Sequence, residues 1–150
     1  MYWRFILLFF FSTTTPASDL KPFTSDGCSA FPDGTLFQQS LWSNCCFSHD
    51  LAYWKGGSAI QKNDADLRLK QCVESVGEPE IAKIMLAGVR VGGSPFLNTS
   101  FRWGYGWPYG RGYKFLSKPD KLQAILKLNA FKQMIDKEIK LLSINESGVE

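Results

Sequence analysis

The sequence predicts an all-α domain that disulfide bonds hold together. Apolar residues recur at helical spacing in three segments, and a fourth segment, which ends at Gly56-Gly57, has residues typical of helix starts and stops. Glycine and proline residues separate these segments. A chain of 150 residues is one domain by size. Its four cysteines follow a segment typical of an export signal, which favours two disulfides formed in an oxidising compartment. Four cysteines allow more than one pairing, and the composition does not select among them.

Residues 1–17 have the pattern of a signal peptide. Arg4 supplies a positive charge, residues 5–11 are an unbroken apolar run, and small residues end the segment at Ala17. A membrane anchor is the alternative, but the apolar run is far shorter than the roughly 20 residues that span a bilayer. We therefore expect cleavage after Ala17, a mature domain of residues 18–150 without a transmembrane segment, and a secreted or periplasmic protein.

The charge balance argues against nucleic acid as a partner. The formal net charge is +3, and this value includes Arg4 in the segment that we expect to be removed. A nucleic-acid-binding domain normally carries a strong basic patch. Nothing in the composition indicates an oligomeric state.

The first helix is predicted from its flanking residues. Residues 18–35 contain prolines and glycines that prevent regular structure. Ser40 or Ser43 could cap the start of a helix after this segment, and Gly56-Gly57 would end it.

The second helix has a clear start signal. Ser58 is followed three residues later by Gln61, which completes a capping box, and the helix runs to about Val76 before a glycine. Its expected buried stripe consists of Ala65, Leu69, Cys72 and Val76. The first two helices should therefore form an antiparallel pair joined by a glycine turn.

Two more helices are predicted in the second half of the chain. The third starts with Pro79 and runs to about Arg90. Residues 96–115 alternate glycines with aromatic residues. A final amphipathic helix runs from about Pro119 to Leu142, and its predicted apolar side consists of Leu122, Ile125, Leu126, Ile135, Ile139 and Leu142.

The strongest chemical signal is the stretch from Cys45 to Tyr53, which holds the only histidine of the chain, His49. If the stretch is helical, Cys45, His49 and Tyr53 lie on one stripe at successive i+4 steps, and Asp50 lies roughly 100° further round. The helix would present a base, a carboxylate and a phenol to one cleft. General-base chemistry also needs a carboxylate that orients the imidazole and a positive group that meets developing negative charge.

Two other segments can supply these groups. Asp66 lies in the second helical segment, six residues before Cys72, and Cys28 lies in the turn-rich loop 25–34. The run Cys-Cys-x-x-His-Asp-x-x-Tyr, the later Asp with Cys six residues on, and the cysteine-bearing glycine loop together resemble secreted phospholipase A2. The likeness runs from Gly27 to Cys72, about a third of the chain.

The resemblance has an internal check. In the family, a further disulfide joins a cysteine just before the tyrosine to a cysteine just before the second-helix aspartate. In this chain these positions are Ala52 and Ala65, so both halves of that disulfide are absent together. The resemblance implies that the remaining disulfides are Cys28–Cys46 and Cys45–Cys72.

The resemblance also implies a reaction and a role for each residue. His49 takes a proton from a water, which attacks the sn-2 ester carbonyl of a phospholipid at a membrane interface. Asp66 orients the imidazole and stabilises its cation, and Tyr53 hydrogen-bonds Asp66. Asp50 ligates Ca²⁺, a hard cation that takes oxygen ligands, together with the backbone carbonyls of Gly27, Ser29 and Phe31.

The expected calcium loop departs from the family pattern, which places glycines around the cysteine. Ser29 and Phe31 lack the backbone freedom of glycine, and Pro32 restricts Phe31 to extended conformations. Asp33 could compensate with a side-chain oxygen. Hydrolysis would be very slow if this loop did not bind calcium.

Alternatives stay open at this point. A catalytically inactive phospholipase A2-like module that binds lipid or protein would use the same fold. A thiol hydrolase would use Cys45 or Cys46 beside His49 and needs a free thiolate. The aromatic residues between Phe101 and Tyr113 would form either a surface for the boundary between lipid and water or a packed aromatic core, and we favour the core.

Overall fold

The computed structural model describes residues 19–146, and this part of the chain contains four α-helices and no β-strand. The helices are α1 (Ser43–Lys55), α2 (Ala59–Ser75), α3 (Pro79–Gly92) and α4 (Lys118–Glu146). The all-α fold class that the sequence predicts is therefore confirmed. None of the described helices combines the length and the apolar composition that crossing a bilayer needs. The predicted signal peptide, residues 1–17, lies outside the described residues.

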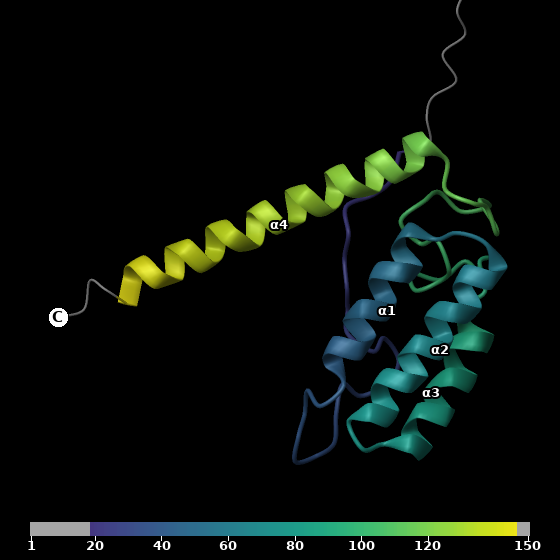
Figure 1. Cartoon of the computed structure of the whole chain (residues 1–150), viewed down its shortest axis with the longest axis horizontal. Helices are drawn as coiled ribbons and strands as arrows, with labels where there is room; N and C mark the ends of the chain where they lie inside the picture. The colour runs from purple at the N-terminus through teal and green to yellow at the C-terminus, as the bar shows by residue number, and fades with distance from the viewer. Residues whose placement is uncertain (1–18, 147–150) are drawn as a thin grey trace, which may run out of the picture.

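Helices α1, α2 and α3 pack side by side and form the body of the protein (Figure 1). The connection between α1 and α2 needs glycine, because Gly56 and Gly57 have φ angles of 67° and 145°. The short connection makes the two helices antiparallel, as predicted, and α3 packs along α2. Their shared core consists of Trp42, Cys45, Cys46, Leu69, Val73, Ala82 and Met85.

Two disulfides fix this body. Cys45–Cys72 joins α1 to α2, and Cys28–Cys46 joins the preceding loop to α1. The pairing is the one that the family resemblance implies. A disulfide typically stabilises a small domain by about 2–4 kcal/mol, mainly because it restricts the unfolded chain. The two bonds therefore hold the loop, α1 and α2 in one fixed arrangement.

The start signals of α2 and α3 act as predicted. The Ser58 side chain accepts a hydrogen bond from the Gln61 amide, and the Gln61 side chain accepts one from the Ser58 amide, so the capping box is complete. Pro79 is the first residue of α3. At the other end of α2, Val76 is the C-cap residue and Gly77 follows it with a φ of 95°.

The start of α1 differs from the prediction. Neither Ser40 nor Ser43 caps the helix, because Trp42 is the N-cap residue and Ser43 is already helical. The Ser43 hydroxyl donates to the Ser40 carbonyl at 2.9 Å instead of accepting from a backbone amide. Trp42 is 3% exposed and its indole N–H donates to the Pro32 carbonyl. The burial of this side chain, and not a hydroxyl cap, fixes where α1 begins.

The glycine-aromatic segment 96–115 contributes the packed aromatic core that we favour from the sequence. Trp103 and Trp107 are buried, and their indole N–H groups donate to backbone carbonyls at the end of α1 and in the turn that follows it. Arg102 is also buried and donates to two carbonyls within the segment, so its charge does not face a lipid surface. Several other aromatic side chains of the segment are exposed: Phe96, Phe101, Tyr109, Tyr113 and Phe115.

Helix α4 lies along the body at its start and then projects well beyond it (Figure 1). Its body-facing residues are Ala124, Leu128 and Phe131, which pack with a cluster of Leu20, Phe23, Trp54 and Trp107. The predicted apolar side is wrong for the first half of α4, because Leu122, Ile125 and Leu126 are all more than half exposed.

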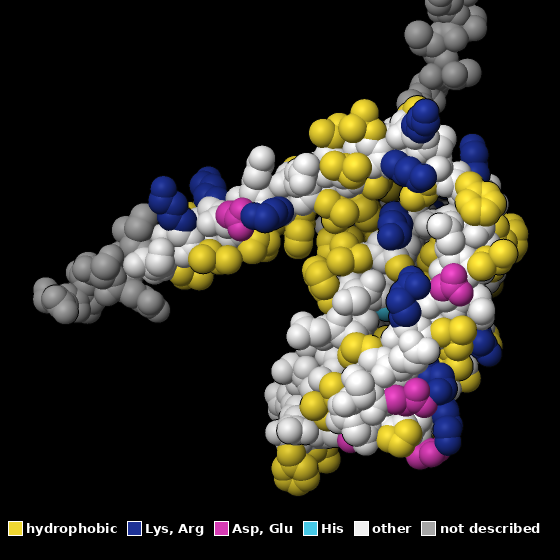
Figure 2. All heavy atoms as spheres, in the orientation of Figure 1, with side chains coloured by type: hydrophobic (Ala, Val, Ile, Leu, Met, Phe, Trp, Pro, Cys, Tyr) yellow, Lys and Arg dark blue, Asp and Glu magenta, His cyan; other side chains and the backbone are white. Residues whose placement is uncertain are grey.

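The distal half of α4 has no buried residue in the described chain. Every residue from Lys132 to Ser143 is exposed, including the predicted apolar positions Ile135, Ile139 and Leu142. Figure 2 shows hydrophobic side chains along this projecting part as well as on the part that meets the body. Only the proximal half of α4 therefore contributes to the core.

Candidate active site

The predicted site residues of α1 and α2 meet inside the body. His49, Asp50 and Tyr53 on α1 are buried, and Asp66 on α2 is 1% exposed. The Cys45–Cys72 disulfide lies four residues before His49 and six residues after Asp66. It therefore ties the two helices together close to the place where these side chains face each other.

Asp66 holds the imidazole of His49. Nε2 of His49 lies 3.1 Å from Oδ1 of Asp66, and the Tyr53 hydroxyl donates to the same oxygen at 2.6 Å. The imidazole and phenol rings are tilted against each other with centroids 4.1 Å apart. A carboxylate can only accept, so it favours the tautomer in which Nε2 carries the proton and Nδ1 the lone pair. Nδ1 is therefore the atom that can act as a base.

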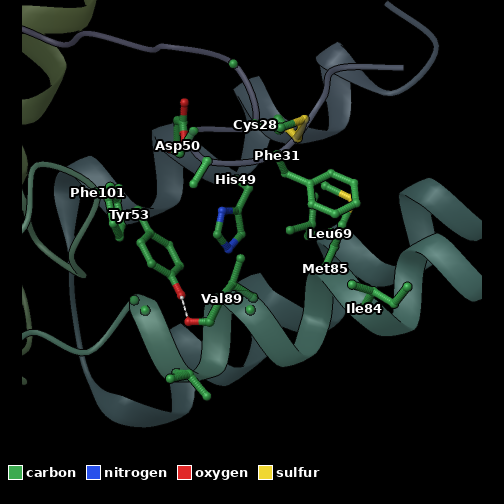
Figure 3. Close-up of a pocket in the computed structure, with 18 residues that line it drawn as sticks. Cys28, Phe31, His49, Asp50, Tyr53, Leu69, Ile84, Met85, Val89 and Phe101 are labelled. Atoms are coloured by element: carbon green, nitrogen blue, oxygen red, sulfur yellow. Dashed lines mark hydrogen bonds between the residues drawn. A yellow bond between two sulfur atoms is a disulfide. The ribbon is translucent and has the colours of Figure 1, made fainter. Parts of the chain in front are cut away.

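Asp66 has a third partner, Lys62, which is not among the predicted site residues. Lys62 lies one turn earlier on α2, and its Nζ donates to Oδ2 of Asp66 at 2.8 Å. Nζ also donates to the Val89 carbonyl of α3 at 3.3 Å, and the Tyr53 hydroxyl oxygen lies at the same distance from that carbonyl (dashed line in Figure 3). The i, i+4 spacing of Lys62 and Asp66 was the signal that could have indicated this pair.

The surroundings of Asp66 keep its carboxylate ionised. Burial alone would raise its pKa, but the hydrogen bonds from His49, Lys62 and Tyr53 and the charge of Lys62 outweigh burial, so the pKa of Asp66 lies below its ordinary value. Burial and the neighbouring carboxylate raise the pKa of Tyr53, so the phenol keeps its proton at neutral pH.

His49 lines a mainly apolar pocket of about 420 Å³ (Figure 3). The pocket lies between α1, α3 and the loop that carries Cys28, and its apolar wall includes Phe31, Leu69, Ile84, Met85, Val89 and Phe101. None of the described residues that line it is a lysine or an arginine. A concave, largely apolar pocket with a few polar groups is typical of a site for a small, mainly apolar ligand.

The loop before α1 lies beside Asp50. The side chain of Asp33 stabilises this loop. The Ser25 hydroxyl donates to Oδ2 of Asp50 at 2.6 Å. Oδ1 of Asp33 accepts from the Cys28 amide at 2.8 Å, and a Cβ at Gly27 would lie only 2.4 Å from this oxygen. The glycine is therefore required for the close approach, and one of the two Asp33 oxygens supports the loop instead of serving as an extra ligand.

The loop reaches its shape without a glycine at position 29. Ser29 has a φ of 54°, in the left-handed region that glycine favours, and no other described residue except glycine has a positive φ. Its hydroxyl donates to Oδ1 of Asp26 at 3.0 Å, which fixes the residue in this conformation. The Phe31 side chain lines the pocket next to the Cys28–Cys46 disulfide (Figure 3).

Asp50 is a buried carboxylate in anionic surroundings. Burial, together with the charges of Asp26 and Asp33, raises the pKa of Asp50 to about 6 against the opposing hydrogen bond from Ser25. An oxygen-rich site with this excess of negative charge suits a hard divalent cation. The residues predicted as calcium ligands, which are Asp50, Gly27, Ser29 and Phe31, line the same pocket. Carboxylate and carbonyl oxygens are the ligand types that calcium takes, so the chemistry of these residues fits this ion.

A second group of metal-ligand atoms lies beside the loop. The Sγ atoms of Cys28 and Cys46 and a carboxylate oxygen of Asp33 all lie within 4.8 Å of one another. The two sulfurs form a disulfide, so they offer no thiolate to a metal, and Asp33 is the only anionic ligand of the group. No cysteine of the described chain is free, which also removes the thiol hydrolase alternative.

Comparison of the chain with family models, curated proteins and solved structures finds no match.

Proposed function

We propose that the protein hydrolyses the sn-2 acyl ester of phospholipids with calcium, by means of a water that His49 activates. The observation that carries the proposal is the 3.1 Å contact between Nε2 of His49 and Oδ1 of Asp66 at the wall of an apolar pocket. This contact leaves Nδ1 as a base beside a space that suits an acyl chain. The choice of ester and substrate rests on the resemblance of residues 27–72 to secreted phospholipase A2.

The side chains of the site account for the proton transfers. Nδ1 of His49 takes a proton from a water as the water oxygen bonds to the ester carbonyl carbon and gives a tetrahedral intermediate. The imidazolium then gives this proton to the leaving alkoxide oxygen while the ester C–O bond breaks, which releases a fatty acid and a lysophospholipid. Asp66 stays ionised throughout, holds Nε2 and stabilises the imidazolium.

The charge distribution of the pocket supports a metal requirement. Calcium, when bound, would supply the positive charge that polarises the ester carbonyl and holds the phosphate. Asp50 and the carbonyls of Gly27, Ser29 and Phe31 would hold the ion. The described pocket lining offers no lysine or arginine for a phosphate, so the side chains alone do not provide this charge.

Fatty-acid release from vesicles of mixed phospholipids tests the proposal. We expect release that depends on calcium and stops with a chelator, and we expect His49→Gln to reduce it by roughly 10²–10⁴-fold because the general base is lost. Ser48→Ala changes an exposed neighbour on the same helix and is the matched control. Mass spectrometry of the lysophospholipid identifies the ester that is cut. Release that persists in His49→Gln, or in the chelator, would contradict the proposal.

The second candidate function is a catalytically inactive module that binds lipid or protein. The observation that favours it is the loop, where Ser29 and Phe31 occupy positions that the resembling family fills with glycine. Such a module would bind vesicles without releasing fatty acid, and its binding would be unchanged in His49→Gln. A titration of release against calcium separates the two candidates.

A further inference from the structure

Lys62 is a buried cation inside the candidate site. Its side chain is 7% accessible, and Nζ donates to Asp66 and to the Val89 carbonyl. Nζ also lies 5.3 Å from the centroid of the Tyr53 ring. A lysine on a helix normally extends its ammonium group into water. This lysine instead turns inward, so it has a role in the interior.

The two oxygens of Asp66 have different partners, and Lys62 binds only one of them. Oδ2 accepts from Lys62, whereas Oδ1 accepts from Tyr53 and faces Nε2 of His49. A carboxylate that lost the Lys62 contact could rotate and present either oxygen, or neither, to the imidazole. The Lys62 contact therefore fixes the orientation in which the Asp66 carboxylate faces Nε2 of His49, and an acceptor in that place selects the tautomer that carries a proton on Nε2.

Lys62 also balances the charge of Asp66. Both side chains are almost completely buried, and an unpaired carboxylate in such a position is strongly unfavourable. With the ammonium group 2.8 Å away, Asp66 stays anionic while His49 is neutral, which is the state from which the imidazole accepts a proton. The hydrogen bond to the Val89 carbonyl fixes the Lys62 ammonium group to α3. Residues of α1, α2 and α3 therefore all contribute to the arrangement.

We propose that Lys62 is a positioning residue that fixes the Asp66 carboxylate and thereby holds His49 in the tautomer with Nδ1 free. Its effect on hydrolysis rests on the proposed function, but its effect on the imidazole does not. Lys62 does not touch the reacting atoms, so its loss lowers kcat and leaves KM nearly unchanged.

Chemical rescue tests this role. We expect Lys62→Met and Lys62→Cys to lower kcat for fatty-acid release by roughly 10–100-fold with KM within about twofold, the usual size of a lost supporting contact. All four native cysteines are in disulfides, so the new thiol of Lys62→Cys is the only one that 2-bromoethylamine can alkylate. The product carries an ammonium group in place of the lysine ammonium, and it should recover most of the kcat. Alkylation with iodoacetamide gives a neutral side chain and should not recover the kcat.

Lys70→Met is the matched control. Lys70 also lies on α2 and pairs with an acid four residues on, Glu74, but it is part-exposed and does not line the pocket. Its substitution should leave kcat and KM unchanged. A loss of kcat in Lys70→Met equal to that in Lys62→Met would show a general effect on α2 and would overturn the assignment.

A measurement on the imidazole separates this proposal from the proposed function. His49 is the only histidine, so the ¹⁵N shifts of its ring report the tautomer directly at alkaline pH. We expect the Nε2–H tautomer in the wild-type protein, a mixture in Lys62→Met, and recovery in the aminoethylated protein. If the wild-type protein shows no hydrolysis but the ¹⁵N shifts behave as expected, the proposed function is refuted and the role of Lys62 stands. An active protein whose tautomer and kcat do not change in Lys62→Met would refute the role and keep the function.

Discussion

At the scale of single residues, two buried aspartates differ in the partners that surround them. Asp66 has hydrogen bonds from His49, Tyr53 and Lys62, and its pKa lies below its ordinary value although burial opposes this. Among the described residues, only Ser25 donates a hydrogen bond to the Asp50 carboxylate, and burial is the main cause that raises its pKa to about 6. The protein itself satisfies the first carboxylate with three donors, whereas the second has a single described donor, in keeping with the proposed calcium site.

We expect Asp50→Asn to stabilise the calcium-free protein at pH 7 by about 1–3 kcal/mol, since a pKa difference of one unit corresponds to about 1.4 kcal/mol. Because its folded-state pKa is raised, Asp50 binds more protons in the folded than in the unfolded state between about pH 4 and pH 6. The wild-type protein should therefore lose stability as the pH rises through this window. Urea unfolding of both proteins at pH 5 and pH 7 in a chelator measures the difference, and an equal stability at pH 7 would contradict the expectation.

Calcium should reverse the difference in stability between the wild-type protein and Asp50→Asn. Binding to the folded state alone stabilises by RT ln(1 + [Ca²⁺]/Kd), which is about 2.7 kcal/mol at a hundredfold excess over Kd. We expect millimolar calcium to raise the unfolding midpoint of the wild-type protein and to leave that of Asp50→Asn unchanged. If calcium leaves the wild-type midpoint unchanged as well, the loop of residues 25–33 does not hold the ion.

At the scale of elements, local signals predict the helices that local residues determine. The capping box at Ser58 and the proline at Pro79 place the starts of α2 and α3, because both act on backbone groups within one turn. The start of α1 depends on the burial of Trp42 against a loop ten residues earlier. Such a tertiary contact has no local signal, so the predicted serine cap is wrong.

The buried face of α4 could not be predicted for a similar reason. Apolar residues occur on several sides of this helix, so periodicity does not select one of them. The segment that contains Leu20 and Phe23 selects the face, since it lies between α4 and the aromatic core. Phe23 contacts Phe131 edge to face at 5.4 Å, and this pair comes from opposite ends of the chain.

The candidate site could be predicted in its main residues but not in its supporting ones. His49, Asp50, Tyr53 and Asp66 follow from a motif with fixed spacing. Lys62 was missed because a lysine four residues before an aspartate is normally a solvent-exposed pair. Supporting contacts such as these depend on which side chains the fold turns inward.

The two alanines that replace a family disulfide give a test at this scale. Ala52 and Ala65 are both buried in one cluster with Tyr53 and Trp103, at the α1–α2 contact. We expect Ala52→Cys/Ala65→Cys to form a third disulfide and to stabilise by about 3 kcal/mol, the value for a loop of this length. Thiol titration and urea unfolding measure both effects, with Ala52→Cys alone as the control. Two free thiols in the folded double variant would show that the helices are not placed as the family resemblance implies.

At the scale of the whole molecule, the protein consists of a compact body and a helix that extends from it. The body contains the disulfides, the pocket and the aromatic core. Within residues 19–146, the α4 residues that pack into this core extend no further than Phe131. Lysines and acidic residues are equally frequent from Lys132 to Glu146, with Lys132, Lys137 and Lys140 against Asp136, Glu138 and Glu146. The projecting half therefore has no net charge that would draw it to an anionic surface.

This division predicts that the two halves of α4 differ in their contribution to stability. Removal of residues 134–150 should change the free energy of unfolding by less than about 0.5 kcal/mol, because this part of α4 has no buried side chain among the described residues. Phe131→Ala should cost about 1–3 kcal/mol, less than a fully buried phenylalanine, because Phe131 is only partly buried against Phe23. The truncated protein should also keep the fatty-acid release of the full chain, since the pocket lies entirely in the body.

Urea unfolding of the two variants beside the wild-type protein decides between a body that folds by itself and one that needs the whole of α4. A truncation as costly as Phe131→Ala would show that the distal half makes tertiary contacts in solution. Phe23→Ala should cost more than Phe131→Ala, about 3–5 kcal/mol, because Phe23 is buried and contacts Phe47, Trp54 and Phe131 together. Phe23 thereby joins α1 to α4. If Phe23→Ala is costly while the truncation is not, the hydrophobic contact between body and helix ends at Phe131, and the helix beyond it is not needed to assemble the site.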